Sequence, residues 1–219
     1  MSLLAVGSIA YDDLETPFGR RENILGGSAT YFSLSASRFS PVRVVAVVGD
    51  DFGPAQEAVF QGRPIDLAGL ARRSGKCFRW KGAYGFDLNE AKTLETHLNV
   101  FAHFRPDLPQ AFRESPHLFL GNIDPTLQLE VLQQMDRPPK WVALDTMNFW
   151  IRGSRKALEE VLHHVDILLV NESEVRELTQ EHNLLKAYRR VQAAGPQILV
   201  GSSMGGWVME PMSSFPHPH

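Results

Sequence analysis

The sequence predicts an α/β protein of three layers, in which helices cover a mostly parallel, Rossmann-like sheet that carries a small β lid. Short apolar runs rich in β-branched residues alternate with amphipathic helical runs, which is the pattern of parallel crossover units. Three successive apolar runs end in polar clusters. Two further runs near residues 77–101 mix apolar and polar residues, as half-exposed strands do. We therefore expect one domain over residues 1–200, lid strands included, and a disordered tail at 201–219.

Length and composition narrow the class of protein. The 219 residues, of which 43% are hydrophobic and 21% charged, suit one globular domain with a substantial core. The net charge of -3 and the lack of a basic stretch argue against a nucleic-acid partner. No run approaches the roughly 20 apolar residues of a membrane helix, and the amino terminus lacks the basic region of a signal peptide. A single cysteine, Cys77, fits the reducing cytoplasm.

The first half of the chain predicts two strands of the sheet, at residues 3–9 and 42–48, joined by a helical run at 32–39. Gly26 and Gly27 precede that helical run. Glycines let a backbone approach a ligand closely, and the start of a helix offers free N–H groups. The spacing matches neither a Walker loop nor the dinucleotide fingerprint. Asp12 follows the first strand, where it is either a turn residue or a ligand contact.

The second half repeats the strand–helix pattern more regularly. We expect strands at 117–120, 141–144, 167–170 and from 198, and helices at 126–135, 155–164 and 184–194, with Ser154 capping the second helix. The strands end in polar pairs, which are Asn122 and Asp124, Asp145 and Asn148, and Asn171 and Glu174. In a parallel sheet these ends share one edge, where ligands of open α/β sheets bind.

Two interpretations of Asn171 and Glu174 stay open at this point. The pair stands where a buried strand becomes a helix at 175–179. An Asn followed three residues later by a Glu is close to a capping box, which satisfies the free N–H groups of a helix start. The same pair also faces the edge of the sheet at which ligands bind.

The lid is expected to consist of strands at 77–84 and 97–101. Arg79, Trp80 and Lys81 would help it to exclude water from a site at the sheet edge, although an edge extension without function fits the pattern as well. Residues 201–219 keep neither helical nor strand periodicity. The closing His217-Pro218-His219 has no fixed geometry, so we expect no metal there.

Taken in order, these features resemble the ribokinase-like (PfkB) family of carbohydrate and nucleoside kinases. The resemblance covers residues 3–200. It is carried by Val6-Gly7-Ser8-Ile9 with Asp12, by Gly26-Gly27 opening a helix, by Val47-Val48-Gly49-Asp50-Asp51-Phe52-Gly53, by the lid position of residues 78–84, and by Asn171-x-x-Glu174.

The resemblance implies a ribokinase-like fold and transfer of the ATP γ-phosphoryl group to a hydroxyl of a small sugar or nucleoside. It implies ATP and Mg²⁺ as cofactors and a homodimer formed through the lid. Asn171 and Glu174 would organise Mg²⁺ and its waters near the phosphates without ligating the metal directly. The substrate would be bound by Asp12, Gly26, Gly27, Thr30, Asn122 and Asp124.

The sequence departs from the family in two places. Thr30 and Tyr31 stand where the family often has an Asn that bonds a sugar hydroxyl, so the acceptor stays open among sugars, sugar phosphates and nucleosides. The family's Gly-Ala-Gly-Asp loop, with its catalytic base, is missing. A base contributes about 10²–10⁴-fold and one oxyanion-type donor about 10²–10³-fold. We therefore expect a chain truncated or frame-shifted after Val200, nearly inactive, with uncovered apolar sheet surface.

Two rivals remain. A non-catalytic sugar- or nucleoside-binding protein would keep the pocket without the chemistry. A dinucleotide-dependent oxidoreductase is disfavoured because its glycine-rich fingerprint is missing.

Overall fold

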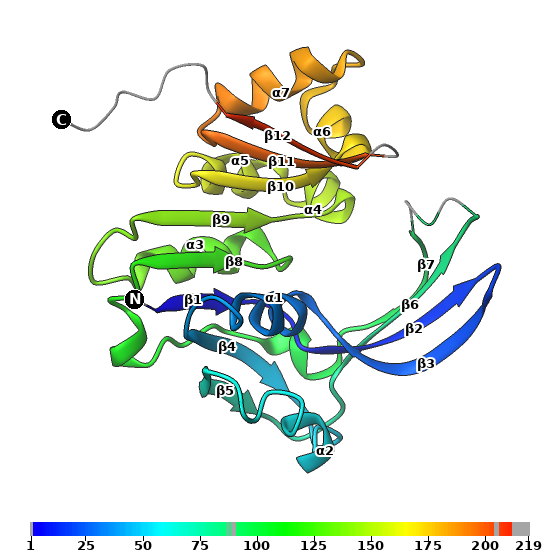
Figure 1. Ribbon diagram of the computed structural model, residues 1–219, viewed down its shortest axis with the longest axis vertical. Helices are drawn as coiled ribbons and strands as arrows, with labels where there is room; N and C mark the ends of the chain where they lie inside the picture. The colour runs from blue at the N-terminus through cyan, green and yellow to red at the C-terminus, as the bar shows by residue number, and fades with distance from the viewer. Residues whose placement is uncertain (1, 87, 89–90, 204–205, 212–219) are drawn as a thin grey trace.

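The computed structural model describes residues 2–86, 88, 91–203 and 206–211. Its main sheet has eight strands: β1 (Leu3–Val6), β4 (Val42–Val48), β5 (Ile65–Arg72), β8 (His117–Leu120), β9 (Trp141–Asp145), β10 (Ile167–Asn171), β11 (Ile198–Ser203) and β12 (Gly206–Pro211). Their order across the sheet is β12-β11-β10-β9-β8-β1-β4-β5 (Figure 1). Every neighbouring pair is parallel except β11 and β12. The predicted mostly parallel sheet is confirmed.

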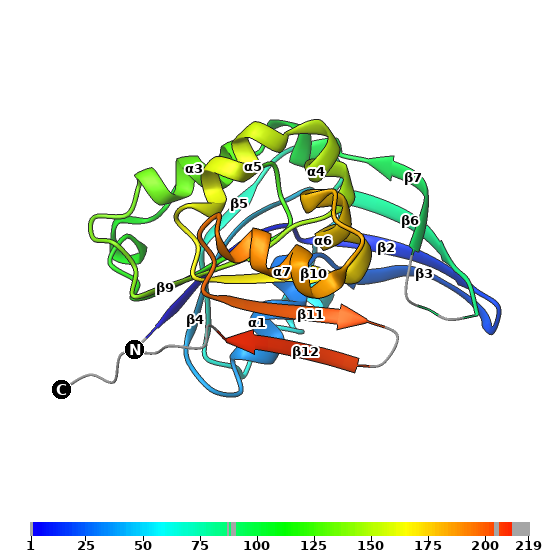
Figure 2. The ribbon, with the colours of Figure 1, turned by 90° about the horizontal axis from the view of Figure 1, so that it is seen from above.

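Helices lie on both faces of this sheet (Figure 2). One face carries α1 (Ser28–Ala36). The other carries α3 (Pro125–Gln133), α4 (Asn148–Gly153), α5 (Arg155–Leu162), α6 (Glu172–Thr179) and α7 (Leu184–Gln192). Shorter pieces are α2 (Pro54–Glu57) and the 3₁₀ turns η1 (Asn99–His103) and η2 (Gln110–Phe112). The three-layer α/β class predicted from the sequence is therefore the observed one. Within the described residues, every helix is too short or too polar to cross a bilayer.

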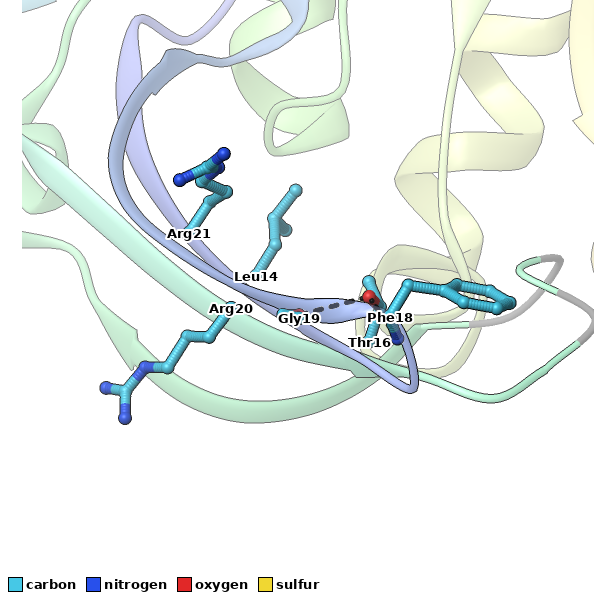
Figure 3. A pocket seen from close by; sticks show the side chains of 6 residues that line it. All are labelled: Leu14, Thr16, Phe18, Gly19, Arg20 and Arg21. Atoms are coloured by element: carbon cyan, nitrogen blue, oxygen red, sulfur yellow. Dashed lines mark hydrogen bonds between the residues drawn. The ribbon is translucent and has the colours of Figure 1, made fainter.

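A second, curved sheet forms the lid, with strand order β3-β2-β6-β7. Its strands are β2 (Ala10–Thr16), β3 (Gly19–Gly26), β6 (Phe78–Tyr84) and β7 (Ala91–His97). The β2–β3 hairpin leaves the carboxyl end of β1, and the lid arches beyond the carboxyl ends of the main strands (Figures 1 and 3). The expected strand at 97–101 is wrong, because β7 ends at His97 and η1 follows. The hairpin was missed because both of its faces are partly exposed and carry charged residues, which hides the alternation of a half-buried strand.

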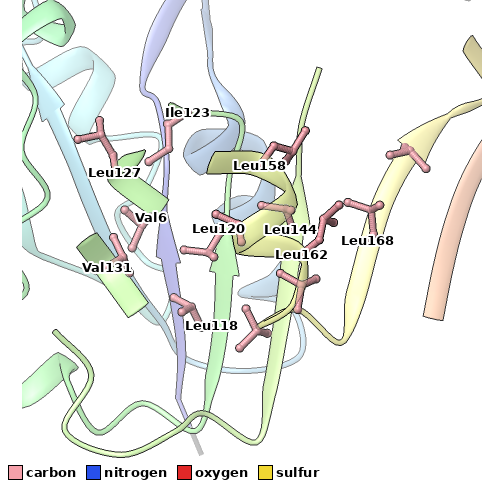
Figure 4. Packing of buried hydrophobic residues seen from close by; sticks show 14 of the residues in the cluster. Val6, Leu118, Leu120, Ile123, Leu127, Val131, Leu144, Leu158, Leu162 and Leu168 are labelled. Atoms are coloured by element: carbon pink, nitrogen blue, oxygen red, sulfur yellow. The ribbon is translucent and has the colours of Figure 1, made fainter. Parts of the chain in front are cut away.

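Two hydrophobic cores lie on the two faces of the main sheet. Side chains that alternate along β1, β8, β9 and β10 pack against α3, α5, α6 and α7 (Figure 4). The intervening side chains of β1 and β4 face α1, where Phe32 stacks on Phe119 with ring centroids 3.7 Å apart. Burial on both faces explains why these strands read as unbroken apolar runs.

One face of β9 and β10 is less covered than the other. Val142, Leu144 and Leu168 are buried on the side of α5, whereas Trp141, Ala143, Ile167 and Leu169 on the side of α1 are only partly buried. This agrees with the expectation of incompletely covered apolar surface. The strands still fix their register, because their buried side chains can point to only one face.

Several boundaries differ from the expected ones. Helix α1 begins at Ser28 rather than at Phe32, because Gly27 supplies the turn into the helix with a φ of 94°. Ser154 is the N-cap residue of α5, as expected, but its side chain makes no capping hydrogen bond. Within the tail, backbone pairing places residues 206–211 in β12, which side-chain periodicity does not reveal. The expected tail also begins inside a strand, because β11 extends to Ser203. Its remaining residues, 204–205 and 212–219, which include His217 and His219, lie outside the described residues.

Candidate active site

The carboxyl ends of the main strands point toward the lid (Figure 1), and polar residues follow several of these strands. Strands β1, β8, β9 and β10 are parallel neighbours, so the residues that follow each of them lie at one edge of the sheet. This edge is where ligands of open parallel sheets bind. Four polar residues belong to this region. Asn122, Asp145 and Glu174 follow or end strands at this edge of the sheet, and Asp12 lies on the adjoining lid strand β2.

Asp12 stands on β2 at the root of the lid. A Cβ placed on Gly26, which lies on the neighbouring strand β3, would overlap the Asp12 carboxylate. Gly26 therefore makes room for Asp12. No described residue hydrogen-bonds that carboxylate. Burial, and to a lesser degree the nearby Asp13, raises the pKa of Asp12 to about 6. A partly buried carboxylate without a partner is poised to accept a hydrogen bond from a ligand.

The start of α1 is fixed behind Asp12. The Ser8 backbone N–H donates to Ser28 Oγ and the Ser28 backbone N–H donates to Ser8 Oγ, both at 3.2 Å. A side chain on Gly27 would strike the Ser8 carbonyl. Thr30 is 1% exposed, and its hydroxyl has no partner among the described residues. The structure thus places Gly26 against Asp12 and Gly27 against Ser8, and it buries Thr30 in the first turn of α1.

Two tyrosines lie near Asp12. Tyr31 on α1 is 55% exposed, and Tyr84 stands at the end of β6. Burial and then the Asp12 carboxylate raise the pKa of both phenols. The charge of Tyr84 also raises the pKa of Tyr31. Asp12, Tyr31 and Tyr84 therefore form one group of interacting side chains between α1 and the lid. Tyr84 was not singled out in the sequence, where it is one aromatic residue at the end of an alternating run.

The three expected lid residues fall on opposite faces of the lid. Trp80 is in register with Asp12, so the two share the inner face. Arg79 and Lys81 alternate to the outer face. Arg79 pairs there with Asp51 at 3.5 Å, and Lys81 pairs with Glu15 at 3.3 Å. The structure therefore brings Trp80, and neither Arg79 nor Lys81, to the side of Asp12.

The same alternation is visible farther out along the lid. Leu14 and Arg21 project from one face while Arg20 projects from the other (Figure 3). Leu14, Thr16, Phe18 and these arginines line a hollow of about 420 Å³ near the lid tip. The hollow lies beyond Asp12, and the polar strand ends do not contribute to its wall.

The run at 49–53 anchors the lid to the main sheet. The Asp51 carboxylate accepts a hydrogen bond from the Cys77 backbone N–H at 2.8 Å, and the Asp51 carbonyl accepts one from the Tyr11 hydroxyl at 2.8 Å. Burial acts to raise the pKa of Asp51, but hydrogen bonds from Cys77 and Arg79 lower it overall. Burial raises the pKa of the Cys77 thiol to about 12, so Cys77 is a structural residue and not a nucleophile.

Asn122 and Asp124 are both engaged by their surroundings. Asn122 Oδ1 accepts a hydrogen bond from the Trp150 indole N–H at 2.8 Å, which ties the end of β8 to α4. Asp124 caps α3, since its Oδ1 accepts from the Thr126 backbone N–H and hydroxyl, each at 2.8 Å. Asn122 lies at the edge of the site, whereas Asp124 is used by the helix.

Asn171 and Glu174 form a complete capping box at the start of α6. Asn171 Oδ1 accepts from the Glu174 backbone N–H at 2.8 Å, and Glu174 Oε2 accepts from the Asn171 backbone N–H at 2.9 Å. The capping interpretation is therefore correct. The cap does not exclude a second role at the strand ends, because the same helix start can satisfy its own N–H groups and also take part in phosphate binding.

Asp145 belongs to a polar pair at a strand end that the sequence predicts, but the sequence alone assigns it no role in the site. Burial and the neighbouring Glu174 carboxylate raise its pKa to about 7. The side-chain oxygens of Thr146 and Asn148 are buried without a partner among the described residues. Spacing carried a signal: Asp145-x-x-Asn148 follows β9 as Asn171-x-x-Glu174 follows β10.

These oxygens fit a hydrated magnesium ion. Mg²⁺ prefers oxygen donors and keeps several waters when it binds one or two carboxylates. The repulsion between Asp145 and Glu174 would be relieved by a divalent cation, and the unpartnered oxygens suit bound water. Among the described residues, no cluster of three or more His, Cys, Asp or Glu side chains forms an all-protein metal cage.

Comparison with known proteins identifies the architecture. No family model matches the chain. A cytidine kinase from Thermococcus kodakarensis is 24% identical over 204 residues, which are 91% of this chain and 72% of that protein. A nucleoside kinase from Burkholderia thailandensis, solved with inosine, superposes with a TM-score of 0.73 at 14% identity over 97% of this chain and 74% of its own. The chain has the ribokinase-like fold.

A fructokinase from Xylella fastidiosa with bound ATP has the same ribokinase-like fold, with a TM-score of 0.73 at 17% identity over 97% of this chain and 75% of its own. The structural neighbours are thus kinases of the PfkB/ribokinase family. The ribokinase-like fold confirms the resemblance found in the sequence, including the small lid at the sheet edge.

Proposed function

We propose that this chain is a phosphotransferase of the ribokinase type that binds a small sugar or nucleoside and ATP. One observation carries the proposal. On a ribokinase-like fold, the Asp12 carboxylate, which has no hydrogen-bond partner among the described residues, and the neighbouring carboxylates of Asp145 and Glu174 belong to the same edge of the sheet, where ligands bind. A relative in sequence is a cytidine kinase, and structural neighbours were solved with inosine and with ATP. This supports a site with one part for the acceptor and one part for the phosphates.

The acceptor half of the site is organised by Asp12. With a pKa of about 6 the carboxylate is ionised at neutral pH and accepts a hydrogen bond from a hydroxyl of the acceptor. This hydrogen bond fixes the orientation of the acceptor. Correct orientation of the reactants supplies much of the reduction in activation free energy in phosphoryl transfer. Tyr31 and Tyr84, whose phenols lie near Asp12, would contact the acceptor, and closure of the lid would exclude water.

The phosphate half lies at the ends of β9 and β10. Asp145 and Glu174 would hold Mg²⁺ through its waters, and Asn171 keeps Glu174 in place through the capping box. The metal would neutralise charge on the phosphates of ATP. In the transfer, the bond between the γ-phosphorus and its bridging oxygen breaks, ADP leaves, and the acceptor oxygen bonds to phosphorus and loses its proton to a base.

That base is not assigned to any of these 219 residues. The family places it in a Gly-Ala-Gly-Asp run, and no such run occurs in the sequence. We propose that the 219-residue chain binds acceptor and MgATP but turns over slowly, because the base contributes about 10²–10⁴-fold. A non-catalytic sugar- or nucleoside-binding protein is the second candidate, and binding of an acceptor without turnover would favour it.

The lid also offers a contact surface. Phe18 and Phe86 meet edge to face near its tip, 6.0 Å apart, and are 74% and 82% exposed. Exposed apolar groups of this kind mark interaction sites, and we propose a homodimer through the lid. Sedimentation of the wild type against Phe18→Ala tests it, since a monomeric wild type at micromolar concentration would rule the dimer out. The buried thiol of Cys77 agrees with a cytoplasmic location, which fractionation of the native host would check.

The central experiment measures binding and turnover separately. Calorimetry with sugars and nucleosides, with and without MgATP, gives affinities, and an ADP-coupled assay gives rates. Asp12→Asn should weaken acceptor binding, and Glu174→Gln should weaken MgATP binding. Asp66→Asn and Glu172→Gln are matched controls, because both change surface carboxylates outside the site. Acceptor binding that does not depend on Asp12 would contradict the proposal.

A further inference from the structure

The inner face of the lid beside Asp12 is aromatic. Trp80 on β6 is in register with Asp12 on β2, and adjacent strands lie about 4.8 Å apart. Tyr84, on the same face of β6, and Tyr31 of α1 complete the surroundings of Asp12. A ligand whose hydroxyl reaches the Asp12 carboxylate therefore has its remaining substituent next to the Trp80 ring.

The Trp80 indole lies flat along the lid. A Cβ on Gly82 would overlap three carbons of its six-membered ring, so the ring covers the α-carbon of Gly82. Gly82 is buried beneath it, whereas Trp80 itself remains partly exposed. Only a glycine two residues along the strand permits this arrangement, which turns the ring face outward instead of its edge.

The indole is also held in place. Its N–H donates a hydrogen bond to Thr93 Oγ1 on β7 at 3.2 Å, and no described aromatic ring is stacked on its face. A ring that is fixed before the ligand arrives loses little entropy on binding. A fixed and uncovered indole face is a stacking platform for a planar, conjugated group.

We infer that Trp80 is a specificity-determining residue that stacks on the base of a nucleoside acceptor while Asp12 binds a hydroxyl of its sugar. The inference rests on the proposed function and narrows it, because a free monosaccharide has no planar ring to use the platform. Each face of a nucleobase suits stacking on an aromatic side chain. Trp80 therefore favours nucleosides over simple sugars without fixing which base is bound.

Calorimetric titration of the 219-residue chain with cytidine, inosine and D-ribose tests the inference. Truncating an aromatic ring that stacks on a base costs about 1–3 kcal/mol, which is about 5- to 150-fold in affinity. The wild type should bind at least one nucleoside about tenfold or more tighter than ribose. Trp80→Ala should remove that preference and leave ribose affinity unchanged, and Trp80→Phe should keep most of it.

Phe39→Ala is the matched control, because Phe39 is an exposed aromatic residue that follows the carboxyl end of α1 and belongs neither to the lid nor to the candidate site. Its nucleoside affinity should equal that of the wild type. Equal binding of ribose and nucleosides by the wild type, or an equal loss of both in Trp80→Ala, would overturn the role of Trp80 while the kinase proposal stands. Nucleoside binding that survives Asp12→Asn unchanged would instead overturn the proposed function, and this inference with it.

Discussion

The carboxylate of Asp12 occupies the space that a side chain on Gly26 would fill. The two residues lie diagonally on neighbouring strands at the root of the lid, because Asp12 of β2 pairs with Ile24 of β3 and Gly26 pairs with Ala10. Gly26 thus contributes to the candidate acceptor site by what it lacks, and Gly27, with its φ of 94°, turns the chain into α1 behind it.

Gly26→Ala should therefore damage the site more than its size suggests. The added methyl group must displace the Asp12 carboxylate or the hairpin backbone, and overpacking of this kind costs about 1–3 kcal/mol. Urea unfolding should report that loss, and calorimetry should report weaker acceptor binding. Gly153→Ala is the control, because a Cβ there meets no atom within 4 Å. An unchanged acceptor affinity in Gly26→Ala would show that Asp12 does not hold the acceptor.

Acceptor binding should depend on pH through Asp12. Its pKa of about 6 in the free protein means that the carboxylate is charged at pH 7 and protonated at pH 5. A protonated carboxyl group is a poorer acceptor for a substrate hydroxyl, so the acceptor Kd should rise by up to about tenfold per pH unit below 6. Titrations from pH 4.5 to 8 in Asp12→Asn should be flat through this range. A wild-type affinity that is constant across pH 6 would contradict the assignment.

The parallel sheet was predictable because its strands are buried on both faces. Val42–Val48 and His117–Leu120 were located to the residue, since continuous apolar runs between turn signals leave little freedom in their boundaries. The lid was only half predictable. Hairpin β2–β3 carries Asp13, Glu15 and Arg20 on an exposed face, and such a strand is held by backbone pairing that a sequence pattern does not display.

In the candidate site, too, some residues could be predicted from the sequence and others could not. Asp12 and Glu174 were predicted as site residues because strand ends and an Asn-x-x-Glu spacing mark them, and they stay predictions. Tyr84 and Asp145 were not assigned a role, because their importance comes from neighbours distant in sequence. The pKa of Asp145 is raised by burial and by Glu174, which lies 29 positions later in the chain. Three-dimensional proximity of this kind has no counterpart in local sequence.

Asp145 should make the protein less stable as the pH rises. Its pKa is raised from 3.8 to about 7 in the folded chain, so the folded state holds a proton that the unfolded state has lost between these values. The resulting stability is fully present below pH 4 and is lost as pH rises to 7. Asp145→Asn should therefore equal the wild type near pH 4 and exceed it by on the order of 1–4 kcal/mol at pH 8. Urea unfolding at both pH values measures this, and parallel curves for the two proteins would refute it.

Magnesium should offset the loss of stability that Asp145 causes in the wild type at high pH. At pH 8 both Asp145 and Glu174 carry charge, and a cation held between them through water stabilises the folded state by mass action. Millimolar Mg²⁺ should raise the thermal midpoint of the wild type and leave Asp145→Asn and Glu174→Gln nearly unchanged. Glu172→Gln, which removes a surface partner of Arg176 at the same helix start, should respond as the wild type does. An equal response of all four proteins would mean that Mg²⁺ acts elsewhere.

A comparison of two helix caps can distinguish a structural role of Asn171 from a role in phosphate binding. Asn171 caps α6 and Asn183 caps α7, each by accepting a hydrogen bond from a backbone N–H, at 2.8 Å and 3.1 Å. Asn171→Ala and Asn183→Ala should therefore cost similar stability, about 1 kcal/mol each by urea unfolding. Only Asn171→Ala also releases Glu174 from its capping box, so only this variant should weaken MgATP binding, by several-fold in a fluorescence titration. Equal weakening in both variants would assign the effect to stability alone and leave Asn171 a cap without a part in the phosphate site.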